Sequence, residues 1–248
     1  MQKLLVRFIC CFIPNRHLRS FMRRIKFGRY KITGKNNIIE FCGHKLPRYF
    51  KIVGVDIHIS GNNNRVVLGR PMRIFHANIT ISNDESNIVI GDGAWLGGLD
   101  IRCAFGRAQN ILIGTHFTAH GVNILCDDMS SISIGNDVLM SNDINIWCSD
   151  GHAIIDNTSK SVINLTHEPL TIGDHCWIGQ GARLLKNARI PSNSIVGGGS
   201  VVGKRFEEEY TVIAGNPARV IRQNVSWDKN LPWVKHMQQL QGEINNVG

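Results

Sequence analysis

Six aliphatic residues recur at intervals of six near the C-terminal end of this 248-residue chain. They are Ile172, Ile178, Leu184, Ile190, Val196 and Val202. A second series follows each of them by four residues, and only its last member is large: Cys176, Ala182, Ala188, Ser194, Ser200 and Phe206. A helix repeats near 3.6 residues and a strand at 2, so neither explains this period. One aliphatic and one small residue in every six predict a parallel β-helix with three units per triangular coil.

The repeat continues upstream, but with interruptions. The interior positions expected in three earlier coils are Ile134, Met140 and Ile146, then Ile113, Ala119 and Leu125, then Ile90 and Leu96. The spacing slips by a few residues between these coils, so we expect short insertions to protrude there. Stacked coils bury one continuous core, which a single coil cannot do. Six units in register make the alternative, a β-sandwich of short strands, a poor explanation of the pattern.

Positive charge is concentrated at the N-terminal end. Residues 1–35 contain ten Lys and Arg and no acidic residue, whereas the rest of the chain holds 18 basic and 19 acidic residues. Leu18, Phe21, Met22 and Ile25 repeat at helical spacing among the arginines, so we expect short amphipathic helices here. Such a segment can anchor to anionic lipid, guide an anionic polymer, or pack as a cap on the first coil. It is too short in apolar residues to span a bilayer.

The seven cysteines show no CxxC pair and no spacing typical of a metal site. An odd number scattered through a repeat core indicates a reducing compartment. Arg7 interrupts the first apolar run, which argues against a signal peptide. We therefore expect a cytoplasmic protein, with peripheral contact at the inner membrane face as an option. No nucleic-acid-binding motif accompanies the basic residues.

The regular repeat breaks after Ile146 and restarts at Ile172. We therefore expect an extruded loop over residues 147–170 and three parts in the chain: a basic helical segment (1–35), a β-helix (36–222) and a C-terminal loop and helix that cap it (223–248). His152 lies just past the break, in CSDGHAI. A histidine on a loop held by a rigid scaffold can act as a general base near neutral pH, but it is also an ordinary surface residue.

Three runs, EPLTIGDHCWIGQGARLL, IVGGGSVVGK and IAGNPARVIR, resemble the hexapeptide-repeat O-acetyltransferases. This family includes maltose, galactoside, xenobiotic and polysaccharide O-acetyltransferases, and the resemblance covers about residues 111–222. It implies a left-handed β-helix, a homotrimer with active sites between subunits, and acetyl transfer from acetyl-CoA to a hydroxyl. It places the catalytic histidine on His152, although Ala153 stands where the family usually has Pro. Asp150 is a candidate partner for that imidazole.

The resemblance also implies binding residues. Asn123 is a candidate for acceptor binding, with a stabilising Asn ladder as the alternative. Trp177 falls on a position beside the family's catalytic centre, with plain surface packing as the alternative. The candidates for the acetyl-CoA groove are small residues for the pantetheine arm and cations for the phosphates: Gly179, Gly181, Gly198, Gly199, Ser200, Lys204, Arg219 and Arg222.

The expected function is acetyl-CoA-dependent O-acetylation of a sugar hydroxyl, with a bacterial surface polysaccharide or its precursor as acceptor and no metal. The basic N-terminal segment motivates this acceptor, because such polymers are built at the inner membrane face. Alternatives are an N-acyltransferase on an amino sugar, a serine-type acetyltransferase and a β-helix that serves only as a scaffold. A metal hydrase would require three converging histidines, which His116 and His120 alone do not supply.

Overall fold

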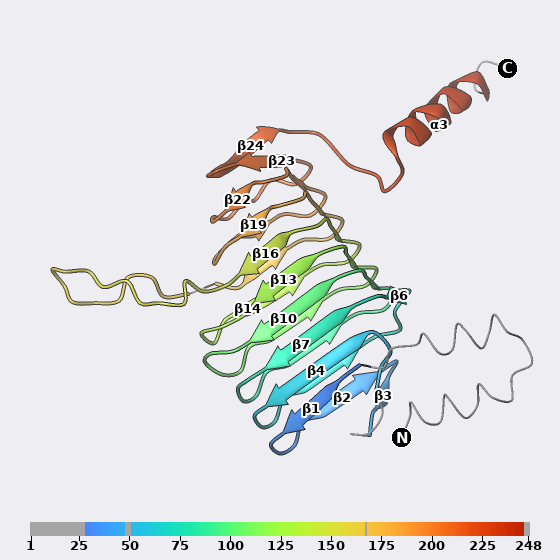
Figure 1. Ribbon diagram of the computed structural model, residues 1–248. Helices are drawn as coiled ribbons and strands as arrows, with labels where there is room; N and C mark the ends of the chain where they lie inside the picture. The colour runs from blue at the N-terminus through green and yellow to red at the C-terminus, as the bar shows by residue number, and fades with distance from the viewer. Residues whose placement is uncertain (1–27, 48–50, 167, 246–248) are drawn as a thin grey trace, which may run out of the picture.

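The chain folds into a three-sided prism of stacked coils, shown by a computed structural model that describes residues 28–47, 51–166 and 168–245. Each side of the prism is a sheet of eight strands (Figure 1). We call the sheets I, II and III in the order in which the chain visits them. Within each sheet, neighbouring strands come from successive coils and pair in parallel, apart from one antiparallel strand at an edge of sheet II and one at an edge of sheet III.

The bounds of the strands follow the sheets. Sheet I contains β1 (Tyr30–Thr33), β4 (Val55–Ser60), β7 (Ala77–Ile81), β10 (Leu99–Cys103), β13 (Val122–Leu125), β16 (Ile144–Trp147), β19 (Arg183–Leu184) and β22 (Val201–Val202). Sheet II contains β2 (Ile38–Phe41), β3 (His44–Lys45), β5 (Arg65–Leu68), β8 (Asn87–Ile90), β11 (Asn110–Ile113), β14 (Ser131–Ile134), β17 (Leu170–Ile172) and β20 (Arg189–Ile190). Sheet III contains β6 (Arg73–Ile74), β9 (Trp95–Leu96), β12 (Thr118–Ala119), β15 (Leu139–Met140), β18 (Trp177–Ile178), β21 (Ile195–Val196), β23 (Val212–Gly215) and β24 (Ala218–Arg222).

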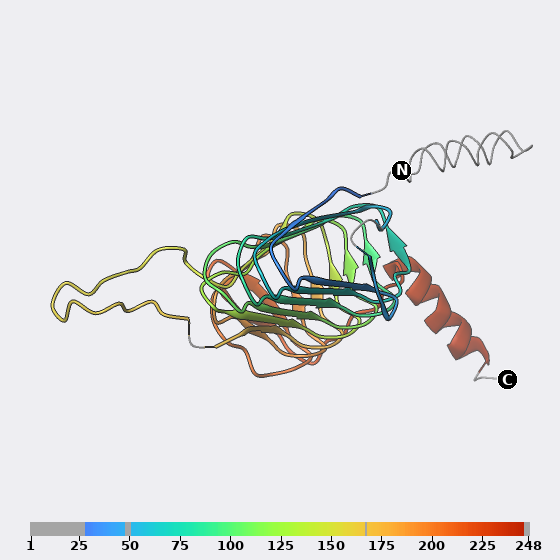
Figure 2. The ribbon, with the colours of Figure 1, turned by 90° about the horizontal axis from the view of Figure 1, so that it is seen from below.

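The coils wind left-handed. Seen from the N-terminal end in Figure 2, the chain turns anticlockwise as it recedes from the viewer toward the C-terminus. Strand β1 lies within the range 1–35, so the described prism already begins at Tyr30. The amphipathic helices expected before it fall on residues 1–27 and lie outside the described part of the chain. Among the described residues, no helix is long and apolar enough to cross a membrane.

The repeat residues form the core, as predicted. All six aliphatics of the C-terminal series are at most 2% exposed, and their small companions are buried beside them. One upstream prediction is wrong: Leu125 faces outward, and Ile124, which is 1% exposed, fills the interior. The strand β13 alternates inward and outward with a period of two, and Val122 and Ile124 set the inward parity. Counting every sixth residue does not take this alternation into account.

The N-terminal coils are longer than the C-terminal ones. Asn78 pairs with Asp100, 22 residues later, whereas Arg183 pairs with Val201 after the 18 residues of three strict repeats. The extra residues gather where sheet I passes into sheet II, for example in 82–86 and 104–109. The extruded loop, residues 148–169, leaves the prism at this same corner (Figure 1). It is therefore the largest of a column of insertions.

The C-terminal part does not cap the prism as expected. Instead, β24 folds back antiparallel on β23 and ends sheet III. Residues 223–231 then run back along the outside of the prism, and the helix α3 (Pro232–Asn245) points away from it (Figure 1). The helix side chains described, up to residue 241, are exposed.

Candidate active site

The root of the extruded loop is held by a polar brace. Asp150 accepts a hydrogen bond from Asn164 Nδ2 at 2.8 Å and pairs with the ammonium group of Lys186. Asn164 Nδ2 also lies 2.9 Å from the carbonyl oxygen of His152, and its Oδ1 accepts from the Ile154 amide at 2.8 Å. Both arms of the loop are thus tied to each other and to the coil that carries Lys186.

The charge of Asp150 fits this brace. Burial acts to raise the pKa of Asp150, but the hydrogen bonds from Lys186 and Asn164 outweigh it, so the pKa lies below the usual aspartate range. The carboxylate is therefore ionised at neutral pH. Its partners are a lysine and an amide, so within one chain Asp150 positions the loop rather than the imidazole of His152. Lys186 and Asn164 carry no motif that could have identified them from the sequence.

The brace leaves His152 exposed on the loop. Its backbone carbonyl is fixed by Asn164, and within the described part of the chain its imidazole makes no hydrogen bond of its own. A histidine in this position is free to meet a group presented from outside the chain. This geometry suits a general base that acts on a bound hydroxyl.

Buried thiols line the same corner. Cys103, Cys126 and Cys148 lie on three successive coils, all within the core. Burial raises the pKa of Cys103 to about 12, so this thiol is neutral. These cysteines pack as small apolar side chains where the loop begins.

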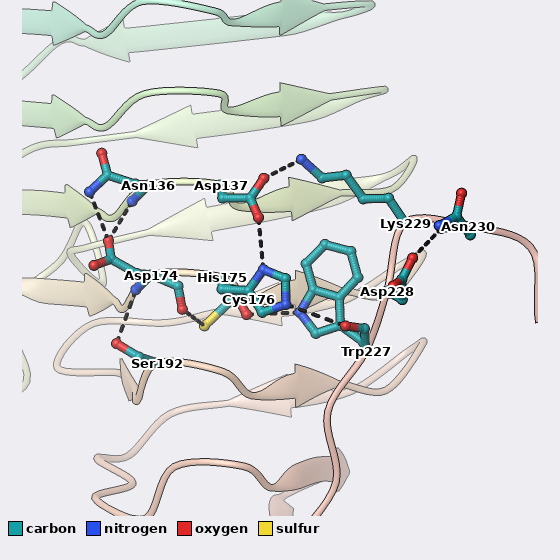
Figure 3. A network of polar contacts seen from close by, with 10 residues as sticks. All are labelled: Asn136, Asp137, Asp174, His175, Cys176, Ser192, Trp227, Asp228, Lys229 and Asn230. Atoms are coloured by element: carbon teal, nitrogen blue, oxygen red, sulfur yellow. Dashed lines mark hydrogen bonds and ion pairs between the residues drawn. The ribbon is translucent and has the colours of Figure 1, made fainter. Parts of the chain in front are cut away.

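Trp177 lies on the outside of sheet III, 39% exposed. Its indole is 6.3 Å, centroid to centroid, from that of Trp227, which follows β24 in the chain. Trp227 in turn stacks on His175 at 4.6 Å and 14°. Figure 3 shows Trp227 and His175, with Asp137 beside the imidazole and Lys229 on the far side of Asp137. Trp227 lies outside the repeat, and no sequence pattern links it to Trp177.

Asn123 belongs to a polar ladder on the outside of sheet I. It lies between Asp100 and Asn145 in the parallel register, and its Nδ2 is 3.5 Å from Asn145 Oδ1. Asn78 continues the ladder below Asp100. The structure therefore places Asn123 among the residues of an Asn ladder, the alternative raised from the sequence.

The predicted glycines gather at the corner between sheets III and I. A Cβ on Gly179 would lie 2.7 Å from the backbone nitrogen of Gly198, so a side chain has no room there. Gly181 and Gly199 have φ of 74° and 68°, the left-handed region that favours glycine. Gly198 and Gly199 are exposed and Gly181 is partly exposed, whereas Gly179 is buried, so the corner presents backbone without side chains at three of the four glycines. Ser200 differs: it is buried, and its Oγ accepts from the Gly215 amide at 3.1 Å.

The three predicted cations come from different parts of the last coils. Arg219 and Arg222 lie on β24, opposite Ala214 and Val212. Lys204 follows β22 at the corner between sheets I and II, with its ammonium 5.0 Å from the ring centroid of Phe206. One chain therefore does not gather all three at one place.

The loop and Trp177 are also separated within one chain. The loop leaves at the corner between sheets I and II, whereas Trp177 begins the strand that follows the corner between sheets II and III. Sheet II lies between them. Figure 2 shows the loop extending away from its own prism. A site that uses both His152 and Trp177 would have to combine residues of two chains.

Known proteins share the six-residue repeat of this chain. The profile of the bacterial transferase hexapeptide family (six repeats) matches residues 169–204. Galactoside O-acetyltransferase of Escherichia coli K12 is 31% identical over 146 residues, which are 59% of this chain and 68% of that protein. The chain belongs to the hexapeptide-repeat acetyltransferases. One likeness of this hexapeptide-repeat acetyltransferase extends beyond the strict repeat. The polysialic acid O-acetyltransferase of Neisseria meningitidis is 28% identical over 82% of this chain and 90% of its own.

Solved structures of two other acetyltransferases show the same fold. The polySia-specific acetyltransferase NeuO superposes with a TM-score of 0.65 and 21% identity, over 88% of this chain and 98% of its own. The polysialic acid O-acetyltransferase OatWY gives 0.52 and 22%, over 82% and 89%. Coverage is not uniform among relatives: the chain spans 58% of the Saccharomyces cerevisiae protein YJL218W, to which it is 35% identical over 121 residues.

Proposed function

We propose that this chain transfers the acetyl group of acetyl-CoA to a sugar hydroxyl of a bacterial surface polysaccharide or of its precursor. The observation that carries the proposal is His152, exposed on a loop whose root is braced and which projects from an acetyltransferase prism. A polysaccharide acceptor is supported by the relatives and structural neighbours that are named for polysialic acid.

The proposed mechanism needs no covalent enzyme intermediate. His152 takes the proton of the acceptor hydroxyl while its oxygen attacks the thioester carbonyl of acetyl-CoA. The tetrahedral oxyanion is stabilised by hydrogen-bond donors and then collapses to the acetyl ester. The carbon–sulfur bond breaks, and the leaving CoA thiolate takes up the proton held by the imidazolium. Holding both substrates in the site supplies part of the acceleration.

The groove for acetyl-CoA is proposed along the glycine corner of the last coils. The accessible backbone at Gly181, Gly198 and Gly199 leaves room for the pantetheine arm, while buried Gly179 lets the next coil approach closely beneath it. Arg219 and Arg222 provide guanidinium groups for the phosphates, which they can grip in a bidentate manner. Lys204 lies at another corner, so it serves this role only toward a cofactor shared with a neighbouring chain.

The test is acetyl transfer from labelled acetyl-CoA to a panel of polysaccharides that contains polysialic acid, capsular heteropolysaccharides and O-antigen. We expect label in the polymer that alkali releases, because esters are hydrolysed under conditions that leave amides intact. Alkali-stable label would indicate N-acylation instead. A panel that stays unlabelled with folded protein would contradict the proposal.

We further propose that the active unit is a homotrimer with each site between two chains. The separation of the loop from Trp177 within one chain supports this arrangement. Mixing refolded His152→Ala and Trp177→Ala chains in equal amounts should restore transfer, because about a quarter of the sites then combine an intact loop with an intact Trp177. Two inactive variants that stay inactive as a mixture, despite exchange of chains shown by mass spectrometry, would place both residues in one chain's site.

A further inference from the structure

After β24 the chain passes along the outside of the prism as a strap, residues 223–231. The amide of Val225 donates to the carbonyl of Tyr210 at 3.0 Å, which fixes the start of the strap. At its far end the Asp228 carboxylate accepts from the Asn230 amide and pairs with Lys235 on α3, both at 2.8 Å. Between these points the strap crosses the coil that carries His175 (Figure 3).

His175 holds the strap in place. Its Nδ1 lies 2.7 Å from Asp137 Oδ2, and its Nε2 lies 3.3 Å from the backbone carbonyl of Trp227. Carboxylate and carbonyl oxygens only accept, so whichever ring nitrogen carries a proton donates to the oxygen that it faces. The other carboxylate oxygen of Asp137 pairs with Lys229 of the strap. The imidazole thus connects Asp137 of the preceding coil with the backbone of the strap.

Asp137, His175 and Lys229 form a clamp that fixes the indole of Trp227. Its Nε1–H donates to the carbonyl of His175 at 2.8 Å, while the ring stacks on the imidazole. The indole of Trp177 lies beside it, tilted by 41°. Two tryptophans that are 50 residues apart in the chain therefore form one aromatic surface on the outside of sheet III. Trp227 is half-buried, and Trp177 remains open to solvent.

We propose that Trp227 is a second acceptor-binding residue, which extends the Trp177 subsite for the apolar face of a pyranose ring. Asp137, His175 and Lys229 are the positioning residues that hold it there. Aromatic side chains give a large contact area at low conformational cost, and sugar rings present C–H groups that pack on them. The inference rests on the proposed function, because it assigns Trp227 to the acceptor rather than to fold stability alone.

The experiment compares Trp227→Ala with Trp233→Ala. Trp233 is a matched control, since it lies on α3, is 69% exposed and stays outside the clamp. The acceptor is purified polysialic acid, or the panel member that the wild-type protein acetylates fastest if that differs. We expect Trp227→Ala to raise the KM for this acceptor by roughly 3- to 10-fold, the range that an aromatic contact supports. The KM for acetyl-CoA and kcat should remain near wild type, and Trp233→Ala should change neither KM.

Two further variants separate binding from folding. Trp227→Phe keeps an aromatic surface and should retain most of the acceptor affinity. Asp137→Asn should raise the acceptor KM in the same direction, and combining it with Trp227→Ala should add little, because both act through one indole. Binding of the same acceptor without acetyl-CoA, followed by tryptophan fluorescence, should weaken in parallel.

The outcomes distinguish this inference from the proposed function. An unchanged acceptor KM in folded Trp227→Ala, while the wild-type protein transfers acetyl groups, overturns the role of Trp227. An equal loss in Trp233→Ala, or a KM increase for acetyl-CoA alone, overturns it as well. A wild-type protein that acetylates no member of the panel contradicts the proposed function, and the assignment of Trp227 to the acceptor then falls with it.

Discussion

His152 is the proposed general base, and its imidazole has no hydrogen-bond partner within the described chain. We expect His152→Ala to fold normally and to lose acetyl transfer by about 10²-fold or more, the range for a general base. His44→Ala, on the exposed strand β3 far from the loop, is the control. Single-turnover transfer together with circular dichroism measures both properties, and wild-type-like turnover by folded His152→Ala would remove it from the mechanism.

A second single-residue change, at Arg219, tests the proposed groove for acetyl-CoA. Replacing this arginine with Ala should raise the KM for acetyl-CoA, because it removes a guanidinium group from the phosphate end, while the acceptor KM stays the same. Arg70→Ala, an exposed arginine on an N-terminal coil, should leave both constants unchanged. Calorimetry with CoA provides an independent measurement. Equal CoA affinity in the wild type and in Arg219→Ala would place the groove elsewhere.

Among the elements of the fold, the extruded loop is the one whose conformation depends on a polar brace at its root. Lys186→Met removes the partner of Asp150, so we expect the loop to sample more conformations and kcat to fall by roughly 3- to 10-fold. Asp150→Asn should have the same effect, and the double variant should lose no more than either one. If Asp150 instead oriented the imidazole, Asp150→Asn alone would shift the pH–rate profile. Hydrogen exchange over residues 148–166 reports the loosening directly.

The brace also has a defined dependence on pH. The pKa of Asp150 is lower in the folded protein than in the unfolded chain, so its contribution is complete above the ordinary aspartate pKa of about 3.9. It is lost as pH falls through the lower folded value. The same sign holds for Asp137, where burial acts to raise the pKa but Lys229 and His175 outweigh it. Neither carboxylate therefore contributes to a pH profile near neutrality.

How far the sequence predicts each element depends on how local its cause is. The six-residue period reports the core directly, because every coil repeats the same inward geometry, as at Ile178 and Ala182. It also reveals the loop, as an interruption of the period. It could not identify Trp227 against His175, since that contact joins residues 52 apart through a strap outside the repeat. The period of six places Leu125 inward, but Leu125 faces outward because strand parity decides side-chain direction in the longer coils.

At the scale of the whole molecule, most of the positive charge of residues 1–35 precedes the described prism, whose first strand, β1, begins at Tyr30. Removing residues 1–27 should leave the coils intact and preserve transfer to soluble acceptors. We expect the full chain, but not the truncated one, to float with anionic vesicles at low salt, and salt to weaken this binding. A matched variant with Arg16, Arg19, Arg23 and Arg24 changed to Gln should behave as the truncated chain does. Equal flotation of both chains, or loss of assembly on truncation, would favour a structural role.

The parallel pairing of the coils also fixes the distances along the axis of the prism. Successive strands of sheet I are spaced by about 4.8 Å, so the five steps from β1 to β16 place the root of the loop roughly 24 Å from the first coil. Deleting a whole coil, such as the 22 residues from Asn78 to Leu99, keeps the register because each coil pairs only with its neighbours. The distance between the first coil and the root of the loop can therefore change only in steps of one strand spacing, one step for each coil added or removed.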